Sequence, residues 1–227
     1  MSSIQRRRDM HDLAQALTML DGFRADSLRK AIAKLEHSLG GLTKSDAKTS
    51  LGKQGVTTKL MRAALLVKKH SSQINEIVHA IGILLVLPHI LEAGESVESL
   101  SLAAGNTGKG FDLETNKRIA EFTFIHWQGG SETVRQNKIF KDFYFLAEAK
   151  TTKKRELFVI GTVYPSRFFE SRRALPSIHG SNRKLGTAFA AKYGKNIRTV
   201  RDHYLPRKHL VAIRDLTKII PALAEPK

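Results

Sequence analysis

The spacing of apolar residues changes near residue 95, and this change limits the folds open to the chain more than any other feature. Before it, apolar residues recur every three or four positions, as in Leu13, Leu17 and Leu20, which predicts helices. After it, the stretch 95–103 (ESVESLSLA) alternates apolar with polar residues, which is the period of a half-buried strand. The chain therefore begins as helices and continues as a sheet.

Further strands and one helix follow in a definite order. FDLET and RIAEFTFIHW predict two strands that form a hairpin about Thr115-Asn116-Lys117. A helix is expected over 132–149, followed by the nearly all-apolar run 156–164 (ELFVIGTVY), which is typical of a central strand buried on both faces. The segment 209–216 (HLVAIRDL) fits a short strand or a helix.

The N-terminal part is predicted to be helical. Helical spacing covers 8–39 and 56–69, and a further helix starts after Ser71 or Ser72 and approaches its end at Pro88. We expect two parts: a helical region over 1–70, and an α/β (α+β) core over 71–227 with a basic C-terminal extension. In the core, helices should flank a mixed sheet.

The charge is strongly positive and unevenly distributed. The net charge is +17, and residues 151–227 hold 17 Lys and Arg against 5 Asp and Glu, whereas 91–150 are slightly acidic. Such an excess favours a polyanionic partner, nucleic acid above all, over lysines and arginines that are simply solvated. The chain has no cysteine, no apolar stretch behind its basic start, and a longest apolar run (81–88) too short for a bilayer. These features predict a cytoplasmic protein without a membrane partner.

Carboxylates stand among apolar residues at the predicted hairpin. Strand alternation puts Glu121 and Thr123 on one face, and pairing about the turn puts Asp112 opposite Glu121. Two such carboxylates repel each other unless a cation lies between them, and oxygen ligands favour Mg²⁺ or Mn²⁺. The alternative is an exposed sheet face with solvated acids. Against it stand apolar neighbours on both faces, such as Phe122 and Phe124.

The order helix, three strands, helix, strand resembles the PD-(D/E)xK nuclease superfamily. Asp112 stands for the motif aspartate, Glu121-Phe122-Thr123 for the (D/E)xK element, and Glu76 for a glutamate that the preceding helix often adds. The resemblance covers about 71–164. It implies a restriction-endonuclease-like fold that cuts double-stranded DNA with Mg²⁺ (or Mn²⁺), with Asp112, Glu121 and Glu76 holding the metal.

Thr123 departs from this pattern, because the motif has lysine at that position. In one account the cation has moved to the following helix, where Lys138 and Lys141 share a flank with Arg135. In the other account the site is inactive and the fold only binds. The catalytic candidates are therefore Glu76, Asp112, Glu121, Thr123, Lys138 and Lys141.

Basic residues outside this site are candidates for contacts with phosphates. They are Lys109, Arg135, Arg172, Arg173, Arg183 and Lys184. Two alternatives to an endonuclease remain. One is a non-catalytic nucleic-acid-binding protein, either a degenerate nuclease fold or a helical DNA-binding regulator; the other is a ribosome-associated or RNA-binding protein, although no aromatic RNA-binding motif is present. The N-terminal helices would assist binding or form a homodimer.

Overall fold

A five-stranded mixed sheet with helices on both faces forms the larger part of the protein. The computed structural model describes residues 3–38, 51–71, 74–102, 110–127, 132–179, 183–194 and 196–224. Its contacts divide the chain into two units, Met1–Asn75 and Glu76–Lys227. The sheet and the carboxylates considered above belong to the second unit.

The strands lie side by side in the order in which they occur along the chain, β1-β2-β3-β4-β5. They are β1 (Val97–Leu100), β2 (Leu113–Thr115), β3 (Arg118–Thr123), β4 (Lys154–Val159) and β5 (Ala212–Asp215). The first three are antiparallel, while β3, β4 and β5 are parallel. Parallel neighbours require long crossovers, and helices supply them here.

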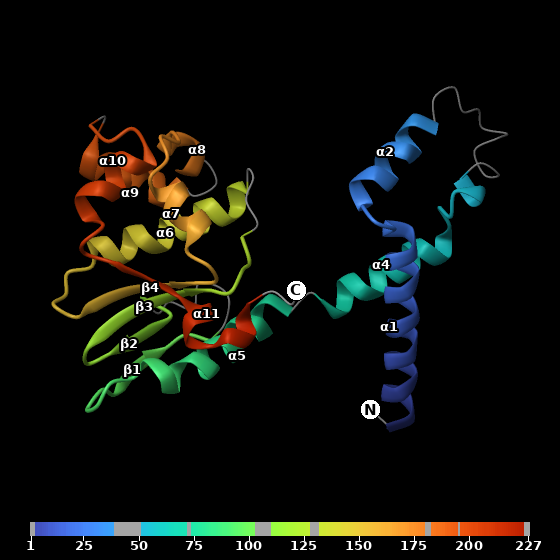
Figure 1. Cartoon of the computed structure of the whole chain (residues 1–227), viewed down its shortest axis with the longest axis horizontal. Helices are drawn as coiled ribbons and strands as arrows, with labels where there is room; N and C mark the ends of the chain where they lie inside the picture. Colours follow the sequence, from blue (N-terminus) through green and yellow to red (C-terminus); the bar gives the residue numbers. More distant parts are fainter. Residues whose placement is uncertain are drawn as a thin grey trace. The chain divides into compact units, whose positions relative to one another are not determined.

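Helices cover the two faces of the sheet unequally (Figure 1). One face packs against the helices between β3 and β5, through buried residues such as Ile119 and Leu157. The other packs against α5 and α11, through residues such as Phe122 and Phe158. The helices are α5 (Ile74–Ile90), α6 (Thr133–Glu148), α7 (Val163–Phe169), α8 (Leu175–His179), α9 (Arg183–Tyr193), α10 (Val200–Tyr204) and α11 (Leu216–Ile219), with 3-10 turns at Leu205–Arg207 and Pro221–Leu223.

The first unit is helical, as predicted. It contains α1 (Ser3–Arg24), α2 (Leu28–Ser38) and α4 (Thr58–His70). The helical spacing over 8–39 does not form one continuous helix, because the backbone turns at Ala25, whose φ is 46°. Ser27 Oγ then accepts a hydrogen bond from the N–H of Lys30 (3.4 Å) as α2 begins.

The second unit has the predicted order of strands and helices, but several predicted strands are shorter than expected: β2 begins at Leu113 rather than Phe111, and β3 ends at Thr123 rather than Trp127. The run 156–164 is not a single strand: β4 ends at Val159, and α7 begins at Val163. Gly161 has a φ of 72°, a left-handed conformation that breaks the strand. The segment 209–216, left open above, forms β5 and the start of α11.

A stretch from Thr58 to Ile90 is long and apolar enough to cross a membrane by length and composition. It runs over residues 72–73, which lie outside the described part of the chain. Core helices often have the same composition, and the inner face of α5 packs Ile83 and Val86 against the sheet. The feature is therefore weak support for contact with a membrane.

A buried ion-pair network ties β3 to its surroundings. The Arg118 guanidinium contacts Glu95 (Nε–Oε1 2.5 Å) and Glu156 (Nη1–Oε2 2.6 Å). Thr115 Oγ donates to the same Glu95 oxygen (2.6 Å). Hydrogen bonds from Arg118 and Thr115 outweigh burial and lower the pKa of Glu95 to about 2. The network joins the entry to β1, the β2–β3 turn and β4.

Gly82 lets α5 approach the sheet closely. A Cβ at this position would lie 2.5 Å from Cε1 and Cζ of Phe124, far inside van der Waals contact. We expect Gly82→Ala to lower the free energy of unfolding, because overpacking costs about 1–3 kcal/mol and outweighs a helix-propensity gain of about 1 kcal/mol.

Urea unfolding followed by circular dichroism measures this effect. Gly22→Ala is the matched control, since nothing lies within 4 Å of a Cβ at Gly22 in α1. A Gly82→Ala variant as stable as the parent would show that the Phe124 ring moves aside at no cost.

Candidate active site

The carboxyl groups of Asp112 and Glu121 meet at the end of the β2–β3 ladder. Leu113 pairs with Ala120 and Glu114 with Ile119, so Asp112, the residue before β2, stands opposite Glu121. The two carboxyls are within hydrogen-bonding reach of each other. The N–H of Phe122 donates to Asp112 Oδ2 (2.9 Å), which fixes the aspartate against β3.

Glu121 is held in its protonated form by its surroundings. Burial raises its pKa most, and the neighbouring charges of Asp142 and Asp112 raise it further, to about 10. Glu121 can therefore donate its proton to Asp112, which explains how two adjacent carboxyls remain together. A divalent cation at this position would take the place of that proton.

Asp112 remains ionised because it has strong donors. Burial alone would raise its pKa, but hydrogen bonds from His79, from the Phe122 N–H and from Glu121 lower it below the usual value. His79, on the inner face of α5, places Nε2 3.2 Å from Asp112 Oδ2 and Nδ1 3.3 Å from the Leu102 carbonyl oxygen. Both ring nitrogens thus face acceptors. The hydrogen bond to Asp112 accordingly raises the pKa of His79 despite its burial.

Lys138 of α6 extends to the strand position where the motif has lysine. Its Nζ lies 3.3 Å from Thr123 Oγ1, 3.4 Å from the Phe122 carbonyl oxygen and 2.6 Å from Asp142 Oδ2. Burial would lower the pKa of Lys138, but attraction to Asp142, and then to Asp112 and Glu121, raises it. The ammonium is therefore charged, and it is close enough to both carboxyls to interact with them electrostatically.

Asp142 was not among the sequence candidates. It lies one turn after Lys138 on α6 and is buried. Burial raises the pKa of Asp142, and the Lys138 ammonium opposes this rise. The i,i+4 spacing of a lysine and an acid was the signal available in the sequence. In the structure this aspartate holds the ammonium in place.

The donor set can accept Mg²⁺ with few protein ligands. Among the described residues, no three His, Cys, Asp or Glu side chains gather as ligands of one ion. Asp112 and Glu121 would supply two carboxylates, and Mg²⁺ commonly binds one or two carboxylates together with waters and substrate phosphate. The raised pKa of Glu121 means that a proton keeps its carboxyl beside that of Asp112. A divalent cation would have to displace this proton and would then stabilise the two carboxylates.

Two of the predicted catalytic residues lie away from the pair. Glu76 is exposed in the first turn of α5, because the inward stripe of that helix begins at His79, one turn later. Lys141 is exposed on α6, while Lys138 turns toward the strand. His79 thus lies where Glu76 was expected, and one lysine of the two reaches Thr123.

The predicted phosphate contacts are placed unevenly. Arg135 forms an ion pair with Glu132 on α6, and Arg172 is exposed. Arg173 donates to Thr133 Oγ1 and Ser177 Oγ, each at 3.3 Å. Arg183 and Lys184 belong to α9, but their side chains, like Lys109, lie outside the described residues.

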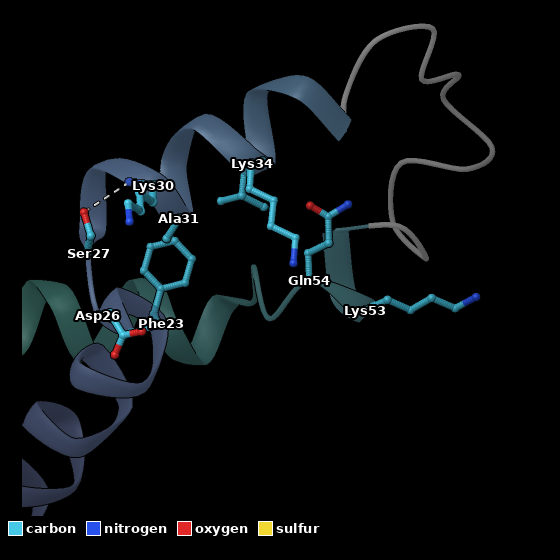
Figure 2. Close-up of a pocket in the computed structure, with 10 residues that line it drawn as sticks. Phe23, Asp26, Ser27, Lys30, Ala31, Lys34, Lys53 and Gln54 are labelled. Atoms are coloured by element: carbon cyan, nitrogen blue, oxygen red, sulfur yellow. Dashed lines mark hydrogen bonds between the residues drawn. The ribbon is translucent and has the colours of Figure 1, made fainter.

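A hollow of about 590 Å³ lies elsewhere, in the first unit (Figure 2). The Phe23 ring lies beneath Ala31, and Lys34 points toward Gln54, whereas Lys53 extends away. The hollow is lined mostly by apolar atoms, and its residues do not form a recognisable catalytic set. The carboxylate site of the second unit therefore remains the stronger candidate.

Comparison with known proteins finds no relative of this chain. The chain matches no family model, no curated protein and no solved structure. What it does must therefore be argued from the site itself.

Proposed function

We propose that the protein is a Mg²⁺-dependent DNA endonuclease with a restriction-endonuclease-like core. The observation that supports this most is the Lys138 ammonium 3.3 Å from Thr123 Oγ1, close enough to Asp112 and Glu121 for their charges to raise its pKa. Lys138 would supply from α6 the positive charge that Thr123 on β3 does not carry.

Each residue of the carboxylate site would have a separate role in phosphodiester hydrolysis. Asp112 and Glu121 would hold the ion, which when bound stabilises negative charge on the scissile phosphate. The Lys138 ammonium would orient the attacking water and balance the developing charge, with Asp142 keeping it in place. His79 would keep Asp112 oriented by its hydrogen bond. The surplus of basic residues would bind the DNA backbone.

The second candidate is a protein that binds DNA through the same fold without cutting it. The raised pKa of Glu121 fits it, because a carboxyl that stays neutral beside Asp112 needs no cation to hold the pair together. The two candidates share the binding surface and differ only in cleavage.

Plasmid cleavage decides between them. We expect the full chain to nick or linearise plasmid DNA with Mg²⁺ or Mn²⁺, and EDTA to abolish this. DNA binding should weaken steeply between about 50 and 200 mM salt, as released counterions require. Binding without cleavage at any divalent ion concentration would favour the second candidate. Binding insensitive to salt would contradict the electrostatic account of either.

A further inference from the structure

A second hollow lies beside the candidate active site, between the end of β3, α6 and α7. It has about 300 Å³ and is lined by Trp127, Gln136, Tyr164, Arg167, Phe168, Ser171 and Arg173. A volume near 300 Å³ is at the small end of ligand pockets, of about 300–1,000 Å³, and suits one nucleotide rather than a double helix. Trp127 lines this hollow and also, together with Thr123, a separate and much narrower one.

The interior of this hollow contains polar atoms without partners. Gln136 is 7% exposed, and its Oε1 has no hydrogen-bond partner among the described residues. The same holds for the indole Nε1 of Trp127. Buried polar atoms in native proteins are nearly always paired, so such a pair of atoms indicates a missing partner. Both atoms are buried, so a ligand in the hollow would pair with them after a small movement of the two side chains.

The walls and rim have complementary chemistry. The rings of Trp127 and Tyr164 lie 6.5 Å apart between centroids at an interplanar angle of 28°, which offers flat surfaces for stacking. Arg167 lies over the Tyr164 ring at 5.8 Å, and Arg173 is held at the rim by Thr133 and Ser177. No acidic residue is among those that line the hollow. Aromatic walls, an amide with an unpaired oxygen and two guanidinium groups match a base, its hydrogen-bonding edge and its phosphate.

We propose that this hollow binds one unpaired nucleotide of a DNA strand, with the base stacked on the aromatic rings and the phosphate at Arg167 and Arg173. The proposal rests on the proposed function, because it makes the hollow a substrate subsite of the nuclease. It specifies a substrate in which at least one nucleotide beside the cut leaves the duplex.

Trp127 is the only tryptophan in the chain and reports on the hollow directly. In EDTA, so that no cutting occurs, the four deoxynucleoside monophosphates should each change its fluorescence saturably. Gln136→Met and Arg173→Gln should weaken this binding about tenfold, a loss of one good interaction. Arg201→Gln, at an exposed residue of α10 that does not line the hollow, should stay within about twofold of the parent. Gln136→Met should melt at the same temperature or higher, because it removes an unpaired buried atom.

Each other outcome is decisive. Inorganic phosphate giving the same change as a mononucleotide would reduce the hollow to an anion site. A lack of saturation, or a Gln136→Met variant that binds normally, would overturn the proposal. Oligonucleotides with an unpaired nucleotide should bind more tightly than a fully paired duplex. A preference for free mononucleotides over such oligonucleotides would show that the ligand is not part of a DNA strand. Cleavage without nucleotide binding would support the nuclease and refute the subsite. Nucleotide binding without cleavage would support the subsite and refute the nuclease.

Discussion

Lys138→Ala is expected to reduce Mg²⁺-dependent plasmid cleavage by about 10²–10³-fold, the usual loss when one stabilising donor is removed from a transition state. Lys141→Ala, on the same helix but exposed, should cleave at close to the parent rate. Both variants should bind DNA similarly, since each loses one positive charge. Because Lys138 also partners the buried Asp142, its removal will lower stability as well, so cleavage is measured below the melting temperature of each variant.

A double variant separates catalysis from folding. Thr123→Lys in the Lys138→Ala background returns the cation to the strand, beside Glu121 and near the space that Lys138 vacates. We expect it to recover a substantial part of the lost cleavage rate. Thr123→Lys alone should not raise activity, because two ammonium groups would then compete for one place. Unchanged cutting in Lys138→Ala would refute a role for this lysine, and failure of the double variant to recover would mean that the helix position itself is required.

Arg118→Met is expected to cost about 3–5 kcal/mol of stability, the largest effect outside the site, because it leaves the buried Glu95 without a guanidinium and Glu156 with only the exposed Arg214. The side chains of Arg118, Glu95 and Glu156 are 4%, 0% and 6% exposed. Glu95, with a pKa lowered to about 2, depends directly on this guanidinium. Urea unfolding at neutral pH measures the loss.

Arg214 provides the matched control for this prediction. It contacts the same Glu156 at 3.1 Å, but its side chain is 57% exposed. Arg214→Met should therefore cost no more than about 1 kcal/mol, as exposed ion pairs do. Equal losses in the two variants would show that burial is not what makes the Arg118 network important.

The sequence predicted those parts of the sheet that depend on local pattern alone. The hairpin about Asn116 and the alternation on β3 follow from turn residues and a period of two, and both are present. The boundary after β4 was not readable, because an apolar run such as IGTVY fits a buried helix as well as a buried strand. The break at Ala25 was missed for a related reason: no glycine or proline marks it.

The candidate site was predictable in part, for the same physical reason. The juxtaposition of Asp112 and Glu121 depends on hairpin register, which the turn fixes. The choice between Lys138 and Lys141, and between Glu76 and His79, depends on how α6 and α5 rotate against the sheet. Sequence spacing shows which residues share one side of a helix, but only the packing of the helix against the sheet decides which of them points toward the site. Asp142 was missed because its importance lies in its contact with Lys138 rather than in a motif.

The strictly sequential strand order has a consequence for how the protein is made. The strands that bring Asp112 and Glu121 together lie within 97–123 and pair by short connections, which close quickly. β4 and β5 join through crossovers that contain whole helices, and contacts of that kind form later. During synthesis, we expect the acidic hairpin to emerge and pair before α6 has left the ribosome. The carboxyl pair would then form before the helix that carries Lys138 and Asp142 can pack against it.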